Sequence, residues 1–186
     1  MPDNISGPEF HKYIDSKLLE KDFHILPVTE NLMKERLGDF MEFVNSVRTE
    51  YSDVYGWSAE NKNYFLNGLV DKWKFSFAVF DKTGEICFVN FSSVYGDIIH
   101  NHCTYAGKKY RRSGLAKLHN LKLCQTGLDN GFTEQEGYWP KTHNKSIILF
   151  LQMGWKIDKV LEDKAYVKMK AELEKVRDKT FEMLNK

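Results

Sequence analysis

Residues 98–131 read IIHNHCTYAGKKYRRSGLAKLHNLKLCQTGLDNG and predict a strand, a basic turn and a helix in direct succession. Residues 98–106 are rich in strand formers, and apolar residues recur at helical spacing after Gly114. The turn between them carries four cations, which are Lys108, Lys109, Arg111 and Arg112. The first N–H groups of a helix are unpaired and carry partial positive charge, so this turn predicts an anion site, most plausibly for phosphate.

The bulk composition is that of an ordinary globular domain. The chain has 186 residues, 42% of them hydrophobic, with a formal net charge of +1. Such a small charge gives no general attraction to nucleic acid or to an anionic membrane, so any basic function must be local. The first residues do not resemble a signal peptide, and no apolar run approaches the ~20 residues that span a bilayer. We therefore expect a cytoplasmic protein without membrane contact.

The cysteines predict no disulfide and no metal site. Cys87, Cys103 and Cys124 are odd in number and show no CxxC or other metal-like spacing. We expect free thiols in a reducing compartment and no bound metal. Cys103 is expected to face away from His102, and Cys124 to lie on the apolar side of its helix. Buried, inert thiols are therefore preferred over a covalent acyl-enzyme role.

The residues before this stretch predict a strand, two helices and a hairpin. Residues 23–28 are expected to form the first strand, and the spacing of apolar residues over 33–51 predicts one long amphipathic helix. A second helix is expected to begin at Ser58. Residues 73–80 and 85–94 flank an Asp-Lys-Thr-Gly turn and predict an antiparallel hairpin.

The residues after it predict the second half of the sheet. We expect a strand over 132–139, a short helix over 144–153, and two strands over 155–160 and 165–169 joined by a turn at 162–164. A charged helix ends the chain. The order β-α-α-β-β-β-α-β-α-β-β describes a mixed α+β domain.

The segment from Arg111 to Ala116 resembles the pyrophosphate loop of the GNAT superfamily of acyl-CoA-dependent N-acyltransferases. That loop reads Gln/Arg-x-x-Gly-x-Gly/Ala, and Arg111, Gly114 and Ala116 fill its three constrained positions. The segment from Ser146 to Trp155 resembles a later helix of the family, which ends in glycine followed by an aromatic residue. The resemblance implies a central, mostly antiparallel, splayed sheet flanked by helices. It also implies an N-terminal extension (1–22), a GNAT-like acetyltransferase domain (23–170) and a C-terminal helical tail (171–186).

The resemblance further implies acetyl-CoA as the co-substrate, held where two central strands part. In the family, the strand before the loop pairs with the pantetheine arm, and N–H groups of the loop hold the pyrophosphate. Carried over to this chain, the cofactor-binding residues are Thr104, Tyr105, Ala106, Arg111, Arg112, Ser113, Gly114, Leu115, Ala116 and Asn144. A glycine at position 114 lets the backbone come close to a phosphate.

Acetyl transfer to an amine needs a base, because an alkylamine is mostly protonated at neutral pH. His100 and His102 are the candidate catalytic residues, since histidine titrates near neutrality. They alternate with Thr104, so the three are expected to share one face of the strand. The alternative is that both histidines are ordinary edge or surface residues. Glu134 and Glu136 could also deprotonate or bind a cationic acceptor, although the preferred interpretation is that they are solvated carboxylates.

The usual acid of the family is missing. Many members place a tyrosine four residues before the helix-ending glycine, and this chain has Phe150 there. The proton for the departing thiolate would then come from Tyr138, Tyr105, His143 or water, or the thiolate would leave unassisted.

Three functions follow from these residues. The leading one is an N-acetyltransferase that acts on an amine of a small molecule or a protein. The second is a non-catalytic acyl-CoA-binding or sensor module with the same fold, which Phe150 supports. The third is nucleic-acid binding through residues 108–112, which the net charge argues against. The sequence does not identify the acceptor, although Tyr55 and Trp57 are expected near its pocket. A homodimer is possible, because the C-terminal helix could reach a neighbouring molecule.

Overall fold

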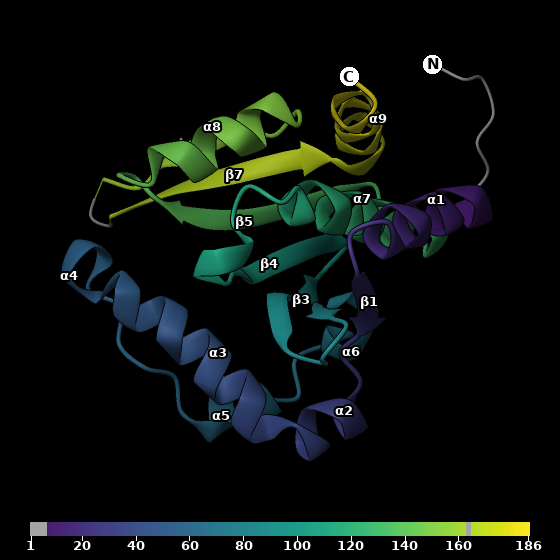
Figure 1. The fold of residues 1–186 in the computed structure, drawn as a ribbon. Helices are drawn as coiled ribbons and strands as arrows, with labels where there is room; N and C mark the ends of the chain where they lie inside the picture. Colours follow the sequence, from purple (N-terminus) through teal and green to yellow (C-terminus); the bar gives the residue numbers. More distant parts are fainter. Residues whose placement is uncertain (1–6, 163–164) are drawn as a thin grey trace.

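The computed structural model describes residues 7–162 and 165–186. They form a seven-stranded sheet in the order β1-β2-β3-β4-β5-β7-β6, with helices on both faces (Figure 1). Every neighbouring pair of strands is antiparallel except β4 and β5, which are parallel. The predicted α+β class and the mostly antiparallel central sheet flanked by helices are confirmed.

The strands are β1 (Phe23–Pro27), β2 (Phe77–Asp81), β3 (Ile86–Tyr95), β4 (Ile98–Ala106), β5 (Glu134–Pro140), β6 (Lys156–Val160) and β7 (Tyr166–Glu172). The helices are α1 (Gly7–Leu19), α2 (Glu30–Glu35), α3 (Leu37–Glu50), α4 (Ser52–Tyr55), α5 (Lys62–Leu66), α6 (Lys72–Phe75), α7 (Leu115–Asp129), α8 (Asn144–Gln152) and α9 (Leu173–Leu184). A 3-10 turn spans Lys108–Tyr110.

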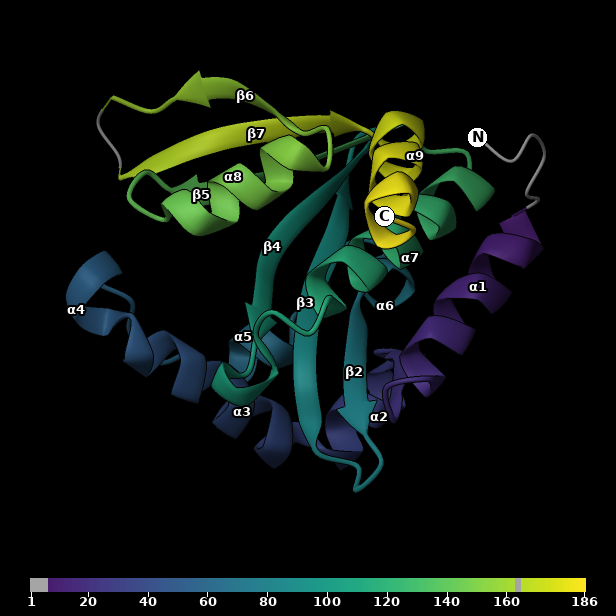
Figure 2. The same ribbon diagram turned by 45° about the horizontal axis from the view of Figure 1, so that its top comes forward.

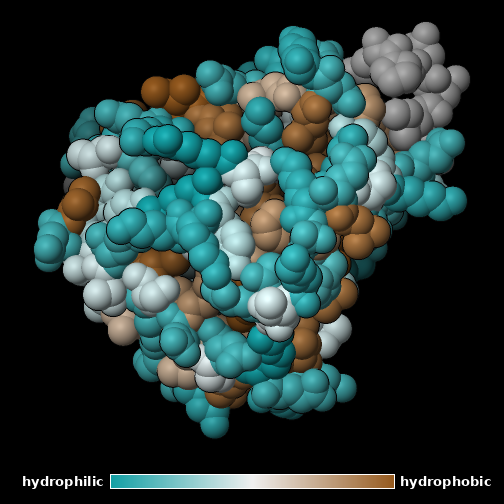
Figure 3. All heavy atoms as spheres, in the orientation of Figure 1, coloured by the Kyte–Doolittle hydropathy of each residue, from teal (hydrophilic) through white to brown (hydrophobic). Residues whose placement is uncertain are grey.

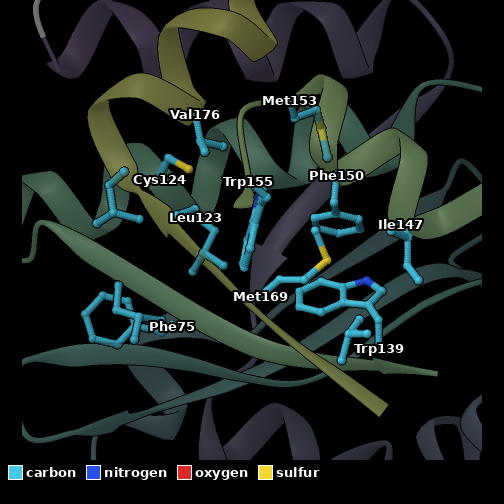
Figure 4. Close-up of a cluster of buried hydrophobic side chains, with 14 of the residues drawn as sticks. Phe75, Leu123, Cys124, Trp139, Ile147, Phe150, Met153, Trp155, Met169 and Val176 are labelled. Carbon is cyan, nitrogen blue, oxygen red and sulfur yellow. The ribbon is translucent and has the colours of Figure 1, made fainter. Parts of the chain in front are cut away.

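The helices cover the sheet in two groups. Helices α1, α7, α8 and α9 lie over one face, which we call the α7 face, and α2, α3 and α5 lie over the other, the α3 face (Figures 1 and 2). The core on the α7 face joins Ile99 of β4 to Leu123 of α7 and Trp139 of β5. Figure 4 shows Trp139 grouped with Phe150 and Trp155 in this core. Each face of the sheet therefore has its own apolar core.

Three predictions of local structure are wrong. The long helix expected over 33–51 is interrupted at Arg36, which separates α2 from α3. The helix expected from Ser58 is the short α5, which Asn61 caps. The strand expected from residue 73 begins only at Phe77, because the preceding residues form α6. Of the turn predicted at 162–164, only the first residue lies within the described part of the chain.

A buried lysine explains the local course of the chain around α6. Lys72 is 2% exposed, and its ammonium donates to the carbonyls of Tyr64 and Phe65 and to Oδ1 of Asn67. Burial lowers the pKa of Lys72 to about 8. Three oxygen acceptors compensate the desolvated charge, so the α5–α6 connection is held against the sheet.

Both terminal helices pack on α7. Helix α1 buries Phe10, Ile14 and Leu18, and these side chains share a core with Leu118 and Leu121 of α7. Phe181 of α9 packs against the same core. On the face seen in Figure 3, hydrophobic side chains gather only in small groups between hydrophilic ones. As far as the structure describes the chain, none of its helices combines the length and apolarity needed to cross a membrane.

A buried histidine in α7 should make the fold sensitive to acid. The ring of His119 packs against Phe88, with 4.9 Å between ring centroids, and its Nε2 has no hydrogen-bond partner among the described residues. Burial lowers the pKa of His119 to about 3. In the unfolded chain its pKa is near 6.5. The unfolded state therefore binds more protons than the folded state between these values, and stability is lost as pH falls from about 6.5 to about 3.

We expect protonation of His119 in the unfolded chain to lower the free energy of unfolding by up to about 1.4 kcal/mol per pH unit between pH 6 and pH 4. Urea unfolding of the wild type and of His119→Leu at pH 7.5, 6, 5 and 4 measures the effect. The variant should show a shallower decline, while above pH 7 the two proteins should differ by a constant amount. Parallel curves over the whole range would contradict the assignment.

Candidate functional site

The sheet opens between β4 and β5. These strands pair only from Ile98–Asn101 against Glu134–Gly137, and beyond that point they diverge (Figure 2). A cavity of about 710 Å³ lies in the opening. Its wall includes residues of β4, β5, the basic turn, the first turns of α7 and α8, and α3. The splayed sheet expected from the sequence is thus present, and the cavity lies where its strands part.

Polar side chains join the strands at the point where they part. The Asn101 side chain accepts hydrogen bonds from Asn90 (3.0 Å) and Ser92 (2.9 Å) and donates to Gln135 (3.3 Å). At Gly137 a Cβ would lie 3.2 Å from the carbonyl oxygen of Asn101, so the absence of a side chain lets the strands approach here. Sequence reasoning missed this network, because no local motif marks residues brought together from three strands.

Strand β4 contains a bulge at His102. Cys103 pairs with Phe91 and Asn101 pairs with the adjacent Ser92, so no residue of β3 stands opposite His102. A bulge adds one residue to one strand and disturbs the alternation of side chains. After His102 the alternation of side chains is therefore shifted by one position. A residue that would have faced one side of the sheet now faces the other.

The bulge overturns two predictions about side-chain direction. The Thr104 hydroxyl accepts a hydrogen bond from Asn90, in the network that includes Asn101, whereas His102 contacts Ser93 on the other face. Cys103 belongs to the core under α3. Thr104 therefore does not share a face with His102, and Cys103 is not on the face opposite to it, because strict alternation ends at the bulge.

The three cysteines are free thiols, and Cys87 is buried as well as Cys103 and Cys124, for which burial was predicted. Burial raises the pKa of Cys87 and of Cys103 to about 11 and that of Cys124 to about 12. Such thiols are protonated at neutral pH and are poor nucleophiles. Among residues 7–162 and 165–186, no three His, Cys, Asp or Glu side chains are grouped to hold a metal ion.

The two candidate catalytic histidines occupy different positions. His102 is in the cavity wall, with Nε2 2.6 Å from Oγ of Ser93. Burial, followed by the charges of His100 and Lys72, lowers the pKa of His102 to about 4, so its ring is neutral at pH 7. His100 lies behind it, with 4.9 Å between ring centroids, and contacts Oε1 of Glu136 at 3.2 Å.

Glu136 is not the solvated carboxylate that the sequence suggested. Its side chain is 12% exposed and contacts both His100 and Lys168, the latter at 2.7 Å. Burial alone would raise the pKa of Glu136, but hydrogen bonds and charges from Lys168 and His100 outweigh it and lower that pKa. The carboxylate is therefore ionised and fully engaged. Glu134, by contrast, is exposed at the beginning of β5.

The basic turn presents unpaired backbone donors to the cavity. Gly114 has a φ of 90° and Arg112 a φ of 68°, so the chain curls tightly before α7. Within the described residues, no protein acceptor meets the N–H groups of Arg112, Gly114, Leu115 and Ala116. Successive N–H groups that line a concavity at a helix start form an anion-binding nest. The anion site stays a prediction, and free N–H groups occur at the turn where it was expected.

The long side chains around the turn are used in different ways. Arg111 is directed toward α3, where its two terminal nitrogens bind the Glu50 carboxylate at 2.7 Å each. Lys21, in the connection between α1 and β1, donates to the carbonyl of Ser113 at 2.7 Å. Sequence reasoning missed Lys21, because it lies 92 residues away from the turn in the chain and in no motif. The turn is therefore held from both sides.

The start of α8 borders the cavity, but not through the residue that was predicted to bind the cofactor. Asn144 is exposed and outside the cavity wall, to which His143, Lys145 and Ser146 contribute. Burial and then the charge of Arg111 lower the pKa of His143. Phe150 borders the cavity from within the core on the α7 face.

Several solved structures that superpose on this chain are acetyltransferases. A putative acetyltransferase from Acinetobacter baylyi superposes with a TM-score of 0.67 at 14% identity, over 81% of this chain and 92% of that one. An acetyltransferase of the GNAT family from Staphylococcus aureus gives 0.65 at 9% identity, over 81% and 99%. The PaiA N-acetyltransferase of Thermoplasma acidophilum, in complex with coenzyme A, gives 0.62 at 11% identity, over 81% and 98%.

The likeness lies in the fold and not in the sequence. No family model matches the chain, and no curated protein matches it in sequence. At these identities the superpositions establish the GNAT fold, as the loop and the order of elements predicted.

Proposed function

We propose that this chain, which has the GNAT fold, is an N-acetyltransferase that moves an acetyl group from acetyl-CoA to an amine. One observation carries the proposal. A single cavity reaches from the nest of free N–H groups before α7 to the opening between β4 and β5, where His102 stands in its wall. An anionic carrier bound at the nest could thus present a reactive group to a neutral imidazole.

The cofactor would lie along the open side of β4. The N–H groups of Arg112, Gly114, Leu115 and Ala116 would hold the pyrophosphate, with Arg111 and Ser113 shaping the turn. From Thr104 through Tyr105 to Ala106, β4 pairs with β3 but has no strand partner toward β5 within the described chain. This free edge supports backbone hydrogen bonds to the pantetheine arm. Ser146 takes the place of Asn144 in this proposal, because Ser146 borders the cavity.

His102 would act as the base. Its neutral imidazole takes a proton from the ammonium of the acceptor, directly or through water, and the free amine attacks the thioester carbonyl. A backbone N–H of β4 would stabilise the resulting oxyanion. The intermediate then loses its second amine proton to solvent and collapses with cleavage of the C–S bond, and the departing CoA thiolate gains a proton. Tyr138, 47% exposed in the cavity wall, is the proposed donor, and His100 supports His102 from behind.

A non-catalytic acyl-CoA-binding module is the second candidate. Phe150 favours it, because this side chain borders the cavity without a hydroxyl to protonate the leaving thiolate. Release of CoA-SH from acetyl-CoA with a panel of primary amines, together with calorimetric binding of acetyl-CoA, separates the two. Turnover above the hydrolysis background supports the enzyme. Tight binding with no turnover on any amine would establish the module instead, and absence of binding would refute both.

The proposal gives Lys21 a role in cofactor affinity. Lys21→Ala should raise the Kd of acetyl-CoA about tenfold at low salt, because the ammonium holds the carbonyl of Ser113 and adds positive charge beside the phosphates. The effect should shrink at 0.5 M salt. Isothermal titration calorimetry at two salt concentrations measures it.

Lys17→Ala provides the matched control. Lys17 lies on α1 and binds Glu20 at 2.9 Å, so its removal changes the same charge without touching the turn. Its Kd should stay within about twofold of the wild type. Equal weakening by both variants would show that only net charge matters and would contradict the contact.

A further inference from the structure

Aromatic side chains form one part of the cavity wall. We call this part the aromatic wall; its residues are Tyr51, Trp57, Tyr105, Tyr138 and His143. Trp57 packs edge-on against Tyr51 and Tyr105, with ring centroids 5.9 and 5.7 Å apart, and Tyr51 contacts His143 at 5.6 Å. These four rings thus form a continuous row from Tyr105 on β4 to His143 before α8, while Tyr138 packs against His100 with 5.6 Å between ring centroids.

The aromatic wall is fixed by polar contacts behind it. The Arg48 guanidinium lies 5.6 Å from the Trp57 ring centroid, donates to the Tyr105 hydroxyl at 3.1 Å and pairs with Glu60 at 2.9 Å. Trp57 also donates from Nε1 to the hydroxyl of Tyr166 on β7 at 3.1 Å, which links the two halves of the sheet across the opening. Rings held in this way offer apolar area at small entropic cost.

The charges of the cavity disfavour an acceptor with several amines. No Asp or Glu of the described chain is in the cavity wall, whereas Arg111, Arg112, Lys117 and Lys145 are. The nearby carboxylates are already engaged, Glu50 by Arg111, Glu60 by Arg48, and Glu136 by Lys168 and His100. A second ammonium would enter without a counter-ion and would lose hydration without compensation.

We infer that the acceptor is an arylalkylamine with a single amine, whose ring packs on Tyr51 and Trp57 while its nitrogen points to His102. This inference rests on the proposed function and names its substrate class. The aromatic wall supplies edge and face contacts to a planar ring. His102, neutral and in the same cavity, receives the proton whose removal frees the amine for attack.

Matched amines test the inference in the wild-type protein. 2-Phenylethylamine and ethylamine differ by the ring, and 1,4-diaminobutane and butylamine differ by the second amine. With kcat/KM expressed per neutral amine, the ring should raise it by about tenfold or more, and the second amine should lower it. A diamine or an N-terminal peptide used better than 2-phenylethylamine would overturn the inference and leave the acetyltransferase in place.

Variants at Trp57 provide the second arm. Trp57→Ala should reduce the ratio of kcat/KM for 2-phenylethylamine over ethylamine about fivefold or more, whereas Trp57→Phe should retain most of it, because a ring is kept. An unchanged acetyl-CoA Kd shows that each variant is folded. A ratio that Trp57→Ala does not move would overturn the inference.

Equilibrium binding separates the inference from the proposed function. 2-Phenylethylamine is titrated into the CoA-loaded protein and followed by tryptophan fluorescence. Saturable binding that Trp57→Ala abolishes, without any turnover, would refute the transferase while supporting the arylalkylamine site. Turnover of other amines without such binding would refute the arylalkylamine site and support the transferase.

Discussion

Replacing Gly114 by tryptophan should raise the KM for acetyl-CoA by roughly 10- to 100-fold, with a smaller change in kcat. Gly114 precedes α7 with a φ of 90°, and its N–H is one of the free donors of the nest. A Cβ at this position would lie 3.5 Å from the Lys21 ammonium, so a bulky side chain would displace Lys21 and fill the space of a phosphate. Initial rates at varied acetyl-CoA concentration measure the effect.

Gly131→Trp separates this effect from backbone strain. Gly131 follows the other end of α7 with a φ of 81°, and no atom lies within 4 Å of a Cβ built there. Both substitutions place a side chain in the left-handed region, at a cost of about 1–2 kcal/mol in stability. Only Gly114→Trp should change the KM. An unaffected KM in that variant would contradict the phosphate cradle.

Replacing His102 by glutamine should lower kcat by about 10²- to 10⁴-fold, because proton removal from the amine loses its base. Glutamine can keep a hydrogen bond to Ser93, so the bulge should survive. The KM for acetyl-CoA should stay close to the wild-type value, since His102 faces the proposed acceptor side. Steady-state rates with saturating acetyl-CoA and a fixed amine provide the measurement.

The pH profile and His100→Gln give the controls. Since the pKa of His102 is about 4, its neutral form is present throughout pH 6–9. At saturating amine the wild-type rate should then stay level in that range, because His102 can accept the ammonium proton throughout it, and should fall only as pH drops toward 4. His100→Gln should cost less than His102→Gln, because His100 is not in the cavity wall. A larger loss of rate in His100→Gln than in His102→Gln would indicate that His100 is the base.

Local sequence was enough to predict the elements that carry the nest. Strand β4 and helix α7 lie where strand formers and helical periodicity placed them, and the glycine before α7 has the left-handed backbone that its residue type allows. The antiparallel succession β2-β3-β4 also followed from the hairpin at Asp81 and the turn after Tyr95. These features depend on residues close together in the chain.

The remaining features depend on partners that periodicity cannot reveal. The helix over 33–51 keeps its apolar stripe across the interruption at Arg36, whose guanidinium binds Asp39 and the carbonyl of Gly84. The bulge at His102 arises from pairing with β3, so alternation along β4 misdirected Thr104 and Cys103. Lys21 and Arg48 reach their contacts from distant segments. Sequence patterns identify which residues can form the site, while tertiary pairing decides which of them face it.

The bulge at His102 lets one strand serve two separate cores. Before it, Ile99 packs with α7, and after it, Cys103 and Tyr105 pack with the α3 side. The residue at the exchange point, His102, has no residue paired opposite it on β3 and contacts that strand through the hydroxyl of Ser93. A substitution at this position can therefore change a side chain of the cavity wall while the hydrophobic packing on either side stays intact. If His102 is the base, as proposed, such a strand lets the chemistry change with little penalty in folding.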